Sequence, residues 1–255
     1  MNENEVERVL RDILNASDSR SELWKRFVTE QKIQRVLELG VYRGEFAEWL
    51  LKQCDTIETF YMIDPWRHLE RWNKPANVPD QEFEGYFQEV LRRTDFAANR
   101  RVVLRGRTTE VIERIPDGEL DFAYIDADHT LRGITIDLIR VYPKLRVGGW
   151  IGGDDFSRSI WQHATAYEPT LVFPFAVYFA EAVGATLFAL PYSQFLMRKN
   201  AEPFFTYQSL VHGYGETDLK GQLGLGKMLH LKLAETGKWI ARQRGLFTKW
   251  MKIHR

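Results

Sequence analysis

The sequence predicts an α/β fold built on a Rossmann-like, doubly wound sheet that is mostly parallel, ends in an antiparallel hairpin strand and carries helices on both faces. One observation is a β-α-β pattern, in which the apolar runs 120–125 and 150–153 flank a stretch of helical periodicity. The expected apolar face of that helix is formed by Leu131, Ile134, Leu138 and Ile139. The other observation is a pair of apolar runs, 186–190 and 194–197, joined by a short turn.

Acidic residues follow both strands of the β-α-β unit. Asp126, Asp128 and His129 come after the first strand, and Asp154 and Asp155 end the second. Because parallel strands end at the same edge of a sheet, we expect these carboxylates to converge on one crevice. A cation between them would relieve their repulsion, although Asp128 can also simply cap the following helix.

Composition narrows the class of protein. The 255 residues favour one large domain with appendages, and 44% hydrophobic residues suffice for a sizeable core. A net charge of +0 does not favour nucleic acid as partner, and the single Cys54 excludes an internal disulfide. The acidic N-terminus lacks the apolar segment of a signal peptide, so a cytoplasmic location is expected.

The chain divides into three segments by pattern. Residues 1–31 form an N-terminal segment with two helices, residues 32–199 form the ligand-binding domain, and residues 200–255 form a C-terminal extension.

A glycine-containing turn gives the first sign of a ligand. Residues 40–44 (GVYRG) connect a short strand at 35–39 to a helix, and the next strand ends at Asp64. Glycines let a backbone approach a ligand at a helix N-terminus, and a carboxylate at the position of Asp64 can accept both ribose hydroxyls. The spacing departs from the G-x-G-x-x-G of dinucleotide sites, which disfavours a nicotinamide enzyme.

Four motifs in order, ELGVYRG, YMIDPW, DFAYIDADHT and GGWIGGDDF, resemble those of class I S-adenosylmethionine-dependent methyltransferases. Within that superfamily they are similar to the divalent-metal-dependent small-molecule O-methyltransferases of the macrocin (antibiotic-sugar) and catechol types. The resemblance covers about residues 33–199. Catechol-type enzymes place Asn where this chain has Asp155, which is closer to the sugar-modifying branch.

The resemblance implies a set of cofactor-binding residues. Those at the methionine end are Glu38, Gly40, Tyr42 and Gly44, with Asp64 on the ribose, Trp66 beside the adenine, and Arg107, Thr108 and Asp126 completing the site.

The resemblance also implies a metal centre. Asp126, Asp154 and Asp155 match the family's ligands, and oxygen donors suit Mg²⁺ or Mn²⁺. His129 matches the position of the general base in catechol-type enzymes, and Asp128 is the competing candidate. Near a divalent cation the imidazole is expected to stay neutral.

Acceptor binding is expected from segments outside the strands. Trp161 and His163 lie in a loop after the second acidic strand end, and the long connection 66–90 is a candidate lid, with an anchored surface loop as the alternative.

The C-terminal stretch 228–255 carries seven Lys or Arg residues against the single acid Glu235. Leu229, Leu233, Ile240, Phe247, Trp250 and Met251 share one side of its helical projection. Contact with an anionic membrane is one expectation. Packing on the domain or across a homo-oligomer is the other.

Taken together, these patterns predict an S-adenosylmethionine-dependent, divalent-metal-assisted O-methyltransferase acting on a hydroxyl of a small molecule, sugar or glycan. The alternatives are a non-catalytic Rossmann-like binding protein and a nicotinamide-dependent oxidoreductase.

Overall fold

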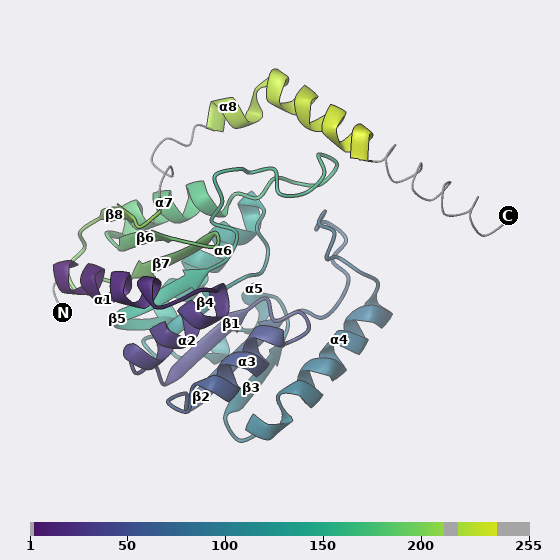
Figure 1. The fold of residues 1–255 in the computed structure, drawn as a ribbon. Helices are drawn as coiled ribbons and strands as arrows, with labels where there is room; N and C mark the ends of the chain where they lie inside the picture. The colour runs from purple at the N-terminus through teal and green to yellow at the C-terminus, as the bar shows by residue number, and fades with distance from the viewer. Residues whose placement is uncertain (1–2, 212–218, 239–255) are drawn as a thin grey trace, which may run out of the picture.

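The computed structural model describes residues 3–211 and 219–238, and it confirms the α/β Rossmann-like fold (Figure 1). One eight-stranded sheet has the order β3-β2-β1-β4-β5-β7-β6-β8. Its strands are β1 Arg35–Leu39, β2 Thr59–Asp64, β3 Arg101–Arg105, β4 Leu120–Ile125, β5 Leu145–Gly153, β6 Thr186–Leu190, β7 Gln194–Arg198 and β8 Thr206–Ser209.

Helices connect most of the strands. The α-helices are α1 Glu3–Asn15, α2 Arg20–Glu30, α3 Glu45–Gln53, α4 Asp80–Arg93, α5 Thr108–Val111, α6 Leu131–Val141, α7 Val172–Val183 and α8 Leu219–Leu223. Short 3-10 helices are η1 Asp95–Ala97, η2 Ile112–Arg114 and η3 Tyr142–Lys144. Residues 225–238 are also helical and continue beyond α8 at the edge of the molecule (Figure 1).

Strands β1 to β5 pair in parallel, so their carboxyl ends share one edge. Strand β7 then runs antiparallel to both β5 and β6, as the hairpin pattern predicts. Tyr192 and Ser193 both have positive φ, the backbone conformation that a tight hairpin turn demands. Strand β8 pairs with β6, so the sheet continues past residue 199, where the sequence pattern ended the domain.

Two apolar clusters lie on opposite faces of the sheet. Helices α1 to α4 bury one face, and α5, α6 and α7 bury the other. Trp24 of α2 is fully buried against Phe122 and Tyr124, with ring centroids 5.4 and 5.3 Å away. Its indole N–H donates to Gln194 Oε1 at 2.9 Å, and this hydrogen bond joins helix α2 to strand β7.

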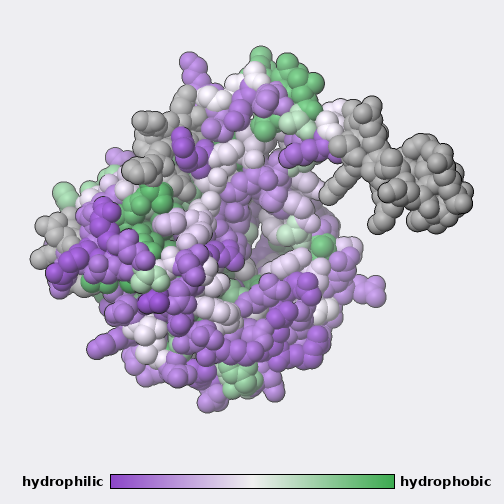
Figure 2. Space-filling model, viewed as in Figure 1, coloured by the Kyte–Doolittle hydropathy of each residue, from purple (hydrophilic) through white to green (hydrophobic). Residues whose placement is uncertain are grey.

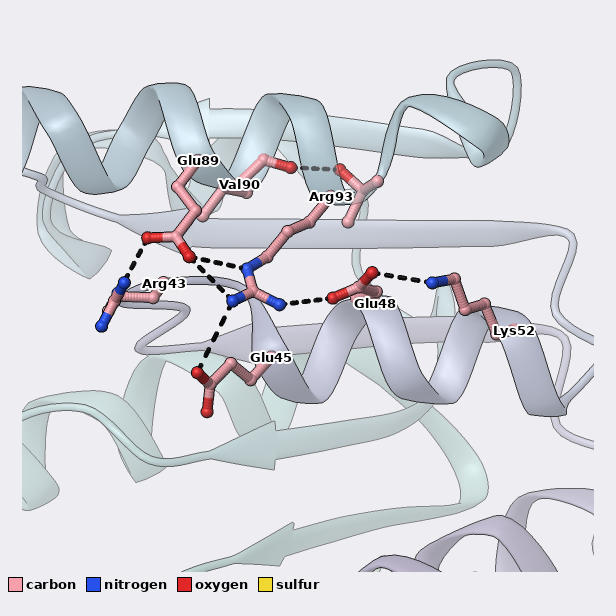
Figure 3. A network of polar contacts seen from close by, with 8 residues as sticks. Arg43, Glu45, Glu48, Lys52, Glu89, Val90 and Arg93 are labelled. Carbon is pink, nitrogen blue, oxygen red and sulfur yellow. Dashed lines mark hydrogen bonds and ion pairs between the residues drawn. The ribbon is translucent and has the colours of Figure 1, made fainter.

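Helices α3 and α4 are joined by a polar network (Figure 3). Arg93 of α4 lies 2.6 Å from Glu48 of α3 and 2.7 Å from Glu89 of its own helix, while Arg43 also contacts Glu89 at 2.8 Å. Exposed ion pairs contribute little individually, but a shared network fixes geometry. Here it holds α4 beside the glycine turn that precedes α3.

Two details differ from the sequence expectation. Of the apolar face expected for α6, Ile134 and Leu138 are buried, whereas Leu131 and Ile139 are about half exposed. Asp137 and Val141 complete the buried face instead. Strand β5 begins at Leu145, five residues before the apolar run 150–153, and it contains Gly148 and Gly149 beside a register shift against β4.

No helix within residues 3–211 and 219–238 has the length and apolar content needed to span a membrane.

The two adjacent α6 residues give a test of the face assignment. Leu138→Ala should lower the free energy of unfolding by about 2–5 kcal/mol, because it leaves a cavity at a fully buried position. Ile139→Ala should change it by less than about 0.5 kcal/mol, since this side chain is 53% exposed. Urea denaturation measures both, and equal losses would contradict the observed packing.

Candidate active site

A cavity of about 1050 Å³ lies at the carboxyl ends of β1, β2 and β4. Figure 2 shows a recess near the middle of this face, bordered mainly by hydrophilic residues. The glycine turn and Asp64 line one part, and Asp126, Asp128, His129 and Asp155 line another. The glycine turn and the acidic strand ends, which the sequence predicted as separate features, therefore line the same cavity.

The glycine turn requires its glycines for different reasons. Gly40 has φ +88°, and a Cβ atom there would lie 2.0 Å from the carbonyl oxygen of Asp126. No side chain fits at that position. Gly44 has φ +75° and is the N-cap of α3. Together they direct the backbone from β1 into α3 along the cavity wall, where Tyr42 is partly exposed.

Asp64 ends β2 and is almost completely buried. Its carboxylate accepts hydrogen bonds from the backbone N–H groups of Tyr42 at 2.9 Å and Trp66 at 2.8 Å. Burial raises the pKa of Asp64 to about 6, and these hydrogen bonds only partly oppose the rise. Asp64 thus fixes the glycine turn and also faces the cavity.

Trp66, expected beside the adenine, does not line the cavity. Its ring is fully buried 5.0 Å from that of Phe87, and its indole N–H donates to the Tyr42 carbonyl oxygen at 2.8 Å. The residue has φ +39°, and its indole enters the core and not the cavity that was expected to hold the adenine.

Glu38 lies in β1 beneath the glycine turn and is 2% exposed. Its Oε2 atom has no hydrogen-bond partner among the described residues, although the side chain lines the cavity. Burial raises the pKa of Glu38 well above its usual value, and the charges of Asp126 and Asp64 raise it further. A buried oxygen without a donor is costly, so this position suits a ligand that donates a hydrogen bond.

Arg107 and Thr108 line the wall that follows β3. Thr108 is buried, and its hydroxyl donates to Asp137 Oδ1 at 2.6 Å. Arg107 is half exposed and pairs with Glu110 at 2.8 Å. Their side chains are engaged within the wall, so a ligand would meet chiefly the backbone around Gly106.

The acids at the end of β5 have internal partners. Asp154 forms a short contact with Arg20 of α2 and accepts from Gln194 Nε2 at 2.7 Å. Sequence reasoning missed Arg20, which lies 134 residues from Asp154 and carries no local motif. Only the packing of Trp24 against the sheet brings it to the cavity.

His129 lies between two carboxylates. Its Nδ1 forms a short contact with Asp155 Oδ2, and its Nε2 is 3.4 Å from Asp126 Oδ1, an ion-pair separation without hydrogen-bond geometry. Burial lowers the pKa of His129, but hydrogen bonding and charge from both acids outweigh it and raise the pKa to about 10. The imidazole was expected to stay neutral near a divalent cation, whereas the two carboxylates by themselves raise its pKa.

The three carboxylates have suitable donor chemistry for Mg²⁺ but not the expected arrangement. Within residues 3–211 and 219–238, no three His, Cys, Asp or Glu side chains converge as a metal site. Asp154 is turned to Arg20, and Asp126 and Asp155 are turned to His129. The predicted metal centre does not fit this arrangement, because internal cations already balance the acids.

Asp128 occupies the cavity wall next to His129. Its Oδ1 accepts from the Trp72 indole at 3.1 Å and from the Thr130 backbone N–H at 3.0 Å. A Cβ atom at Gly133 would lie 2.1 Å from the Asp128 Cγ atom, so this glycine makes room for the carboxylate. The contacts to Oδ1 orient the second oxygen, which accepts no hydrogen bond from the described residues.

Two loops meet over the cavity. Asn73 Nδ2 donates to the Ala166 carbonyl oxygen at 2.9 Å, and Lys74 Nζ donates to the Glu168 carbonyl oxygen at 2.9 Å and to Thr170 Oγ1 at 3.2 Å. Lys74 is 7% exposed. Burial lowers its pKa, which the nearby acids, Asp128 first, partly counteract. Sequence reasoning missed this buried lysine, because nothing in its local sequence distinguishes it from a surface lysine.

The two residues expected at the acceptor site differ in position. His163 lines the cavity and is exposed. Trp161 does not line it; its indole donates instead to the Gln222 carbonyl oxygen at 2.9 Å in the C-terminal segment. Direct acceptor binding by Trp161 is therefore not supported by this geometry.

Comparison with solved structures shows the same fold in several proteins. A Staphylococcus aureus protein assigned as a caffeoyl-CoA O-methyltransferase gives a TM-score of 0.55 at 16% identity, covering 78% of this chain and 93% of that chain. A Bacillus cereus O-methyltransferase in complex with S-adenosylhomocysteine gives 0.51 at 17% identity, covering 78% and 91%. TomG, an O-methyltransferase involved in tomaymycin synthesis in Streptomyces achromogenes, gives 0.51 at 14% identity, covering 76% and 90%, and contains S-adenosylmethionine.

The sequence was also compared with curated proteins and with family models. No curated protein is similar enough to this chain to match it. Residues 37–156 match the family model of a methyltransferase domain, and this range runs from β1 to just past Asp155. The matched range contains the glycine turn, Asp64 and the acids that line the cavity, and the fold is shared with the solved O-methyltransferases.

Proposed function

We propose that the protein transfers a methyl group from S-adenosylmethionine to a hydroxyl of a small molecule, sugar or glycan. The observation that carries this proposal is the single cavity that joins the Gly40–Gly44 turn and Asp64 to Asp128. Methyl transfer needs the donor sulfonium, the acceptor oxygen and a proton acceptor within one enclosed space.

The residues around the glycine turn fit the cofactor. Bound S-adenosylmethionine would supply the electrophilic methyl group. The orphaned Oε2 of Glu38 suits its ammonium group, which donates hydrogen bonds. Asp64 suits its ribose hydroxyls, and the backbone at Gly40 permits close approach because no side chain intervenes.

Asp128 is the better candidate for the general base in this geometry. Its Oδ1 is held by Trp72 and Thr130, which leaves Oδ2 to accept a proton from an acceptor hydroxyl. Both nitrogens of His129 face carboxylates, so neither is directed toward an acceptor hydroxyl. His129 would instead hold Asp126 and Asp155 in place by its positive charge.

The acceptor side of the cavity is polar. His68, Arg71, Lys74, Arg132 and His163 line it together with the acids. Such a wall suits an acceptor with several hydroxyl or acidic groups, as a sugar or polyphenol has. Two of the similar proteins are named for small-molecule chemistry, caffeoyl-CoA and tomaymycin, which also favours a small acceptor.

The role of Asp64 predicts both an affinity change and a pH dependence. Asp64→Ala should weaken S-adenosylhomocysteine binding by about tenfold or more, because a hydrogen bond to a charged group contributes roughly 1.5–3 kcal/mol. In the unaltered protein, affinity should fall as the pH drops through about 6, where Asp64 of the free protein becomes protonated. Calorimetry from pH 5 to 8 measures both, with the exposed Asp95→Ala as control. Unchanged affinity in Asp64→Ala would rule out the ribose assignment.

The base assignment separates two neighbouring residues. A screen of sugars, glycosides and catechols with labelled S-adenosylmethionine first identifies an acceptor. Asp128→Asn should then reduce kcat by about 10²–10⁴, the usual contribution of a general base. His129→Gln should reduce kcat less, and both variants should keep their affinity for S-adenosylhomocysteine. The reverse order of losses would make His129 the base.

Arg20 predicts how the acids respond to a divalent cation. Arg20→Gln removes the guanidinium that pairs with Asp154. Because the pair is partly exposed, the affinity of the protein for Mn²⁺ should rise by only about tenfold. The electron paramagnetic resonance signal of free Mn²⁺ measures this, with Arg26→Gln, on the same helix but paired with Glu22, as matched control. Equal affinity in both variants would show that Asp154 takes no part in cation binding.

A further inference from the structure

The helix at residues 225–238 carries an apolar stripe that the described part of the chain does not cover. Leu225, Leu229 and Leu233 recur every four residues and are 90%, 61% and 64% exposed. Leu223, at the end of the preceding α8, is also 58% exposed. Figure 2 shows hydrophobic residues gathered at the top of the molecule, where Figure 1 places this helix. A soluble protein rarely leaves such a row open unless it meets another surface.

The other side of this helix faces the protein. Met228, Leu231 and Glu235 are half-buried and follow helical spacing. The Glu235 carboxylate accepts hydrogen bonds from the Thr165 backbone N–H at 2.8 Å and hydroxyl at 3.2 Å. The helix is thus anchored by one face, and the leucine stripe is its outward side.

The charged side chains beside the leucine stripe determine which kind of surface it can bind. Lys227, Lys232 and Lys238 are exposed along the helix, whereas Glu235, its only acid, is turned to Thr165. In the sequence that follows, residues 239–255 add five Lys or Arg residues and no acid, together with Trp239, Phe247 and Trp250. Self-association through this face would bring lysines against lysines. An anionic lipid surface instead offers acyl chains to the leucines and negative headgroups to the lysines.

We propose that the outward face of helix 225–238 binds an anionic membrane surface. The leucine stripe enters the headgroup boundary, and the lysines contact the lipid phosphates and carboxylates. Because Glu235 of this helix holds the loop at Thr165, and Gln222 of the adjoining α8 holds the same loop at Trp161, binding orients the loops above the cavity toward the membrane. This inference stands apart from the methyl-transfer chemistry, since none of its residues lines the cavity.

The experiment is co-sedimentation of the full chain with vesicles of phosphatidylcholine containing phosphatidylserine, and with vesicles of phosphatidylcholine alone. The protein should bind only the anionic vesicles, and high salt should release it because the lysine contribution is screened. Leu229→Asp/Leu233→Asp should weaken binding by at least about tenfold, because both apolar side chains are lost to the bilayer. Lys227→Glu/Lys232→Glu should weaken it and reduce its salt dependence.

The matched control is Ile139→Asp, which places the same charge at an aliphatic residue that is 53% exposed on α6. It should bind vesicles like the unaltered protein. Unchanged S-adenosylhomocysteine affinity in every variant shows that the domain is folded. Absence of vesicle binding, or equal binding by the leucine variant, would overturn the proposal. So would light scattering that shows a dimer lost in the leucine variant without any vesicle binding, since the stripe would then be a contact between copies.

Discussion

The site depends on how closely two backbone segments approach at the ends of β1 and β4. The Gly40 turn lies against the Asp126 carbonyl with no space for a side chain, and the Asp126 N–H donates to the Leu39 carbonyl oxygen at 2.8 Å. These strands are neighbours in the sheet although the chain visits β2 and β3 between them. This is the point where the strand order reverses, and it is where an open α/β sheet forms a crevice. Every other part of the site is built around this contact.

Electrostatics is the second constraint on the site. Glu38, Asp64, Asp126 and the acids of β5 crowd one edge of the sheet, and burial with mutual repulsion raises the pKa of Asp154. Basic side chains from three different regions lie near these acids and offset their charge: Arg20, Lys74 and His129. Buried charge without partners is unfavourable, so helix α2 and the loop at residue 74 stabilise the acidic edge as well as covering it.

The sheet could be predicted from the sequence because local patterns determine it. The apolar runs, the glycine turn and the acids at strand ends each depend on near neighbours, and they gave the strands, the hairpin and the shared cavity edge. The partners of those acids could not be predicted. Arg20 reaches Asp154 through the packing of Trp24, and Lys74 is buried by a loop ninety-four residues away. The backbone of Trp66 has a positive φ where its side chain enters the core, and the local sequence does not indicate that conformation. Burial of a polar side chain is a tertiary property, so neither the pairing of the acids nor the position of His129 between two of them could be predicted from periodicity.

The hydrogen bonds among the segments that cover the cavity have a consequence for redesign of the protein. The loop at 66–79 is hydrogen-bonded to the loop at 157–171. That second loop is hydrogen-bonded to α8 and to helix 225–238. These three pieces contact one another through their own hydrogen bonds, whereas the Gly40 turn and Asp64 belong to the sheet. They form one hydrogen-bonded unit, which is also joined to the site where the Trp72 indole donates to Asp128. An engineer who seeks a different acceptor should therefore exchange the pieces as one unit, because replacing a single loop would leave the donors and acceptors of its neighbour unpaired.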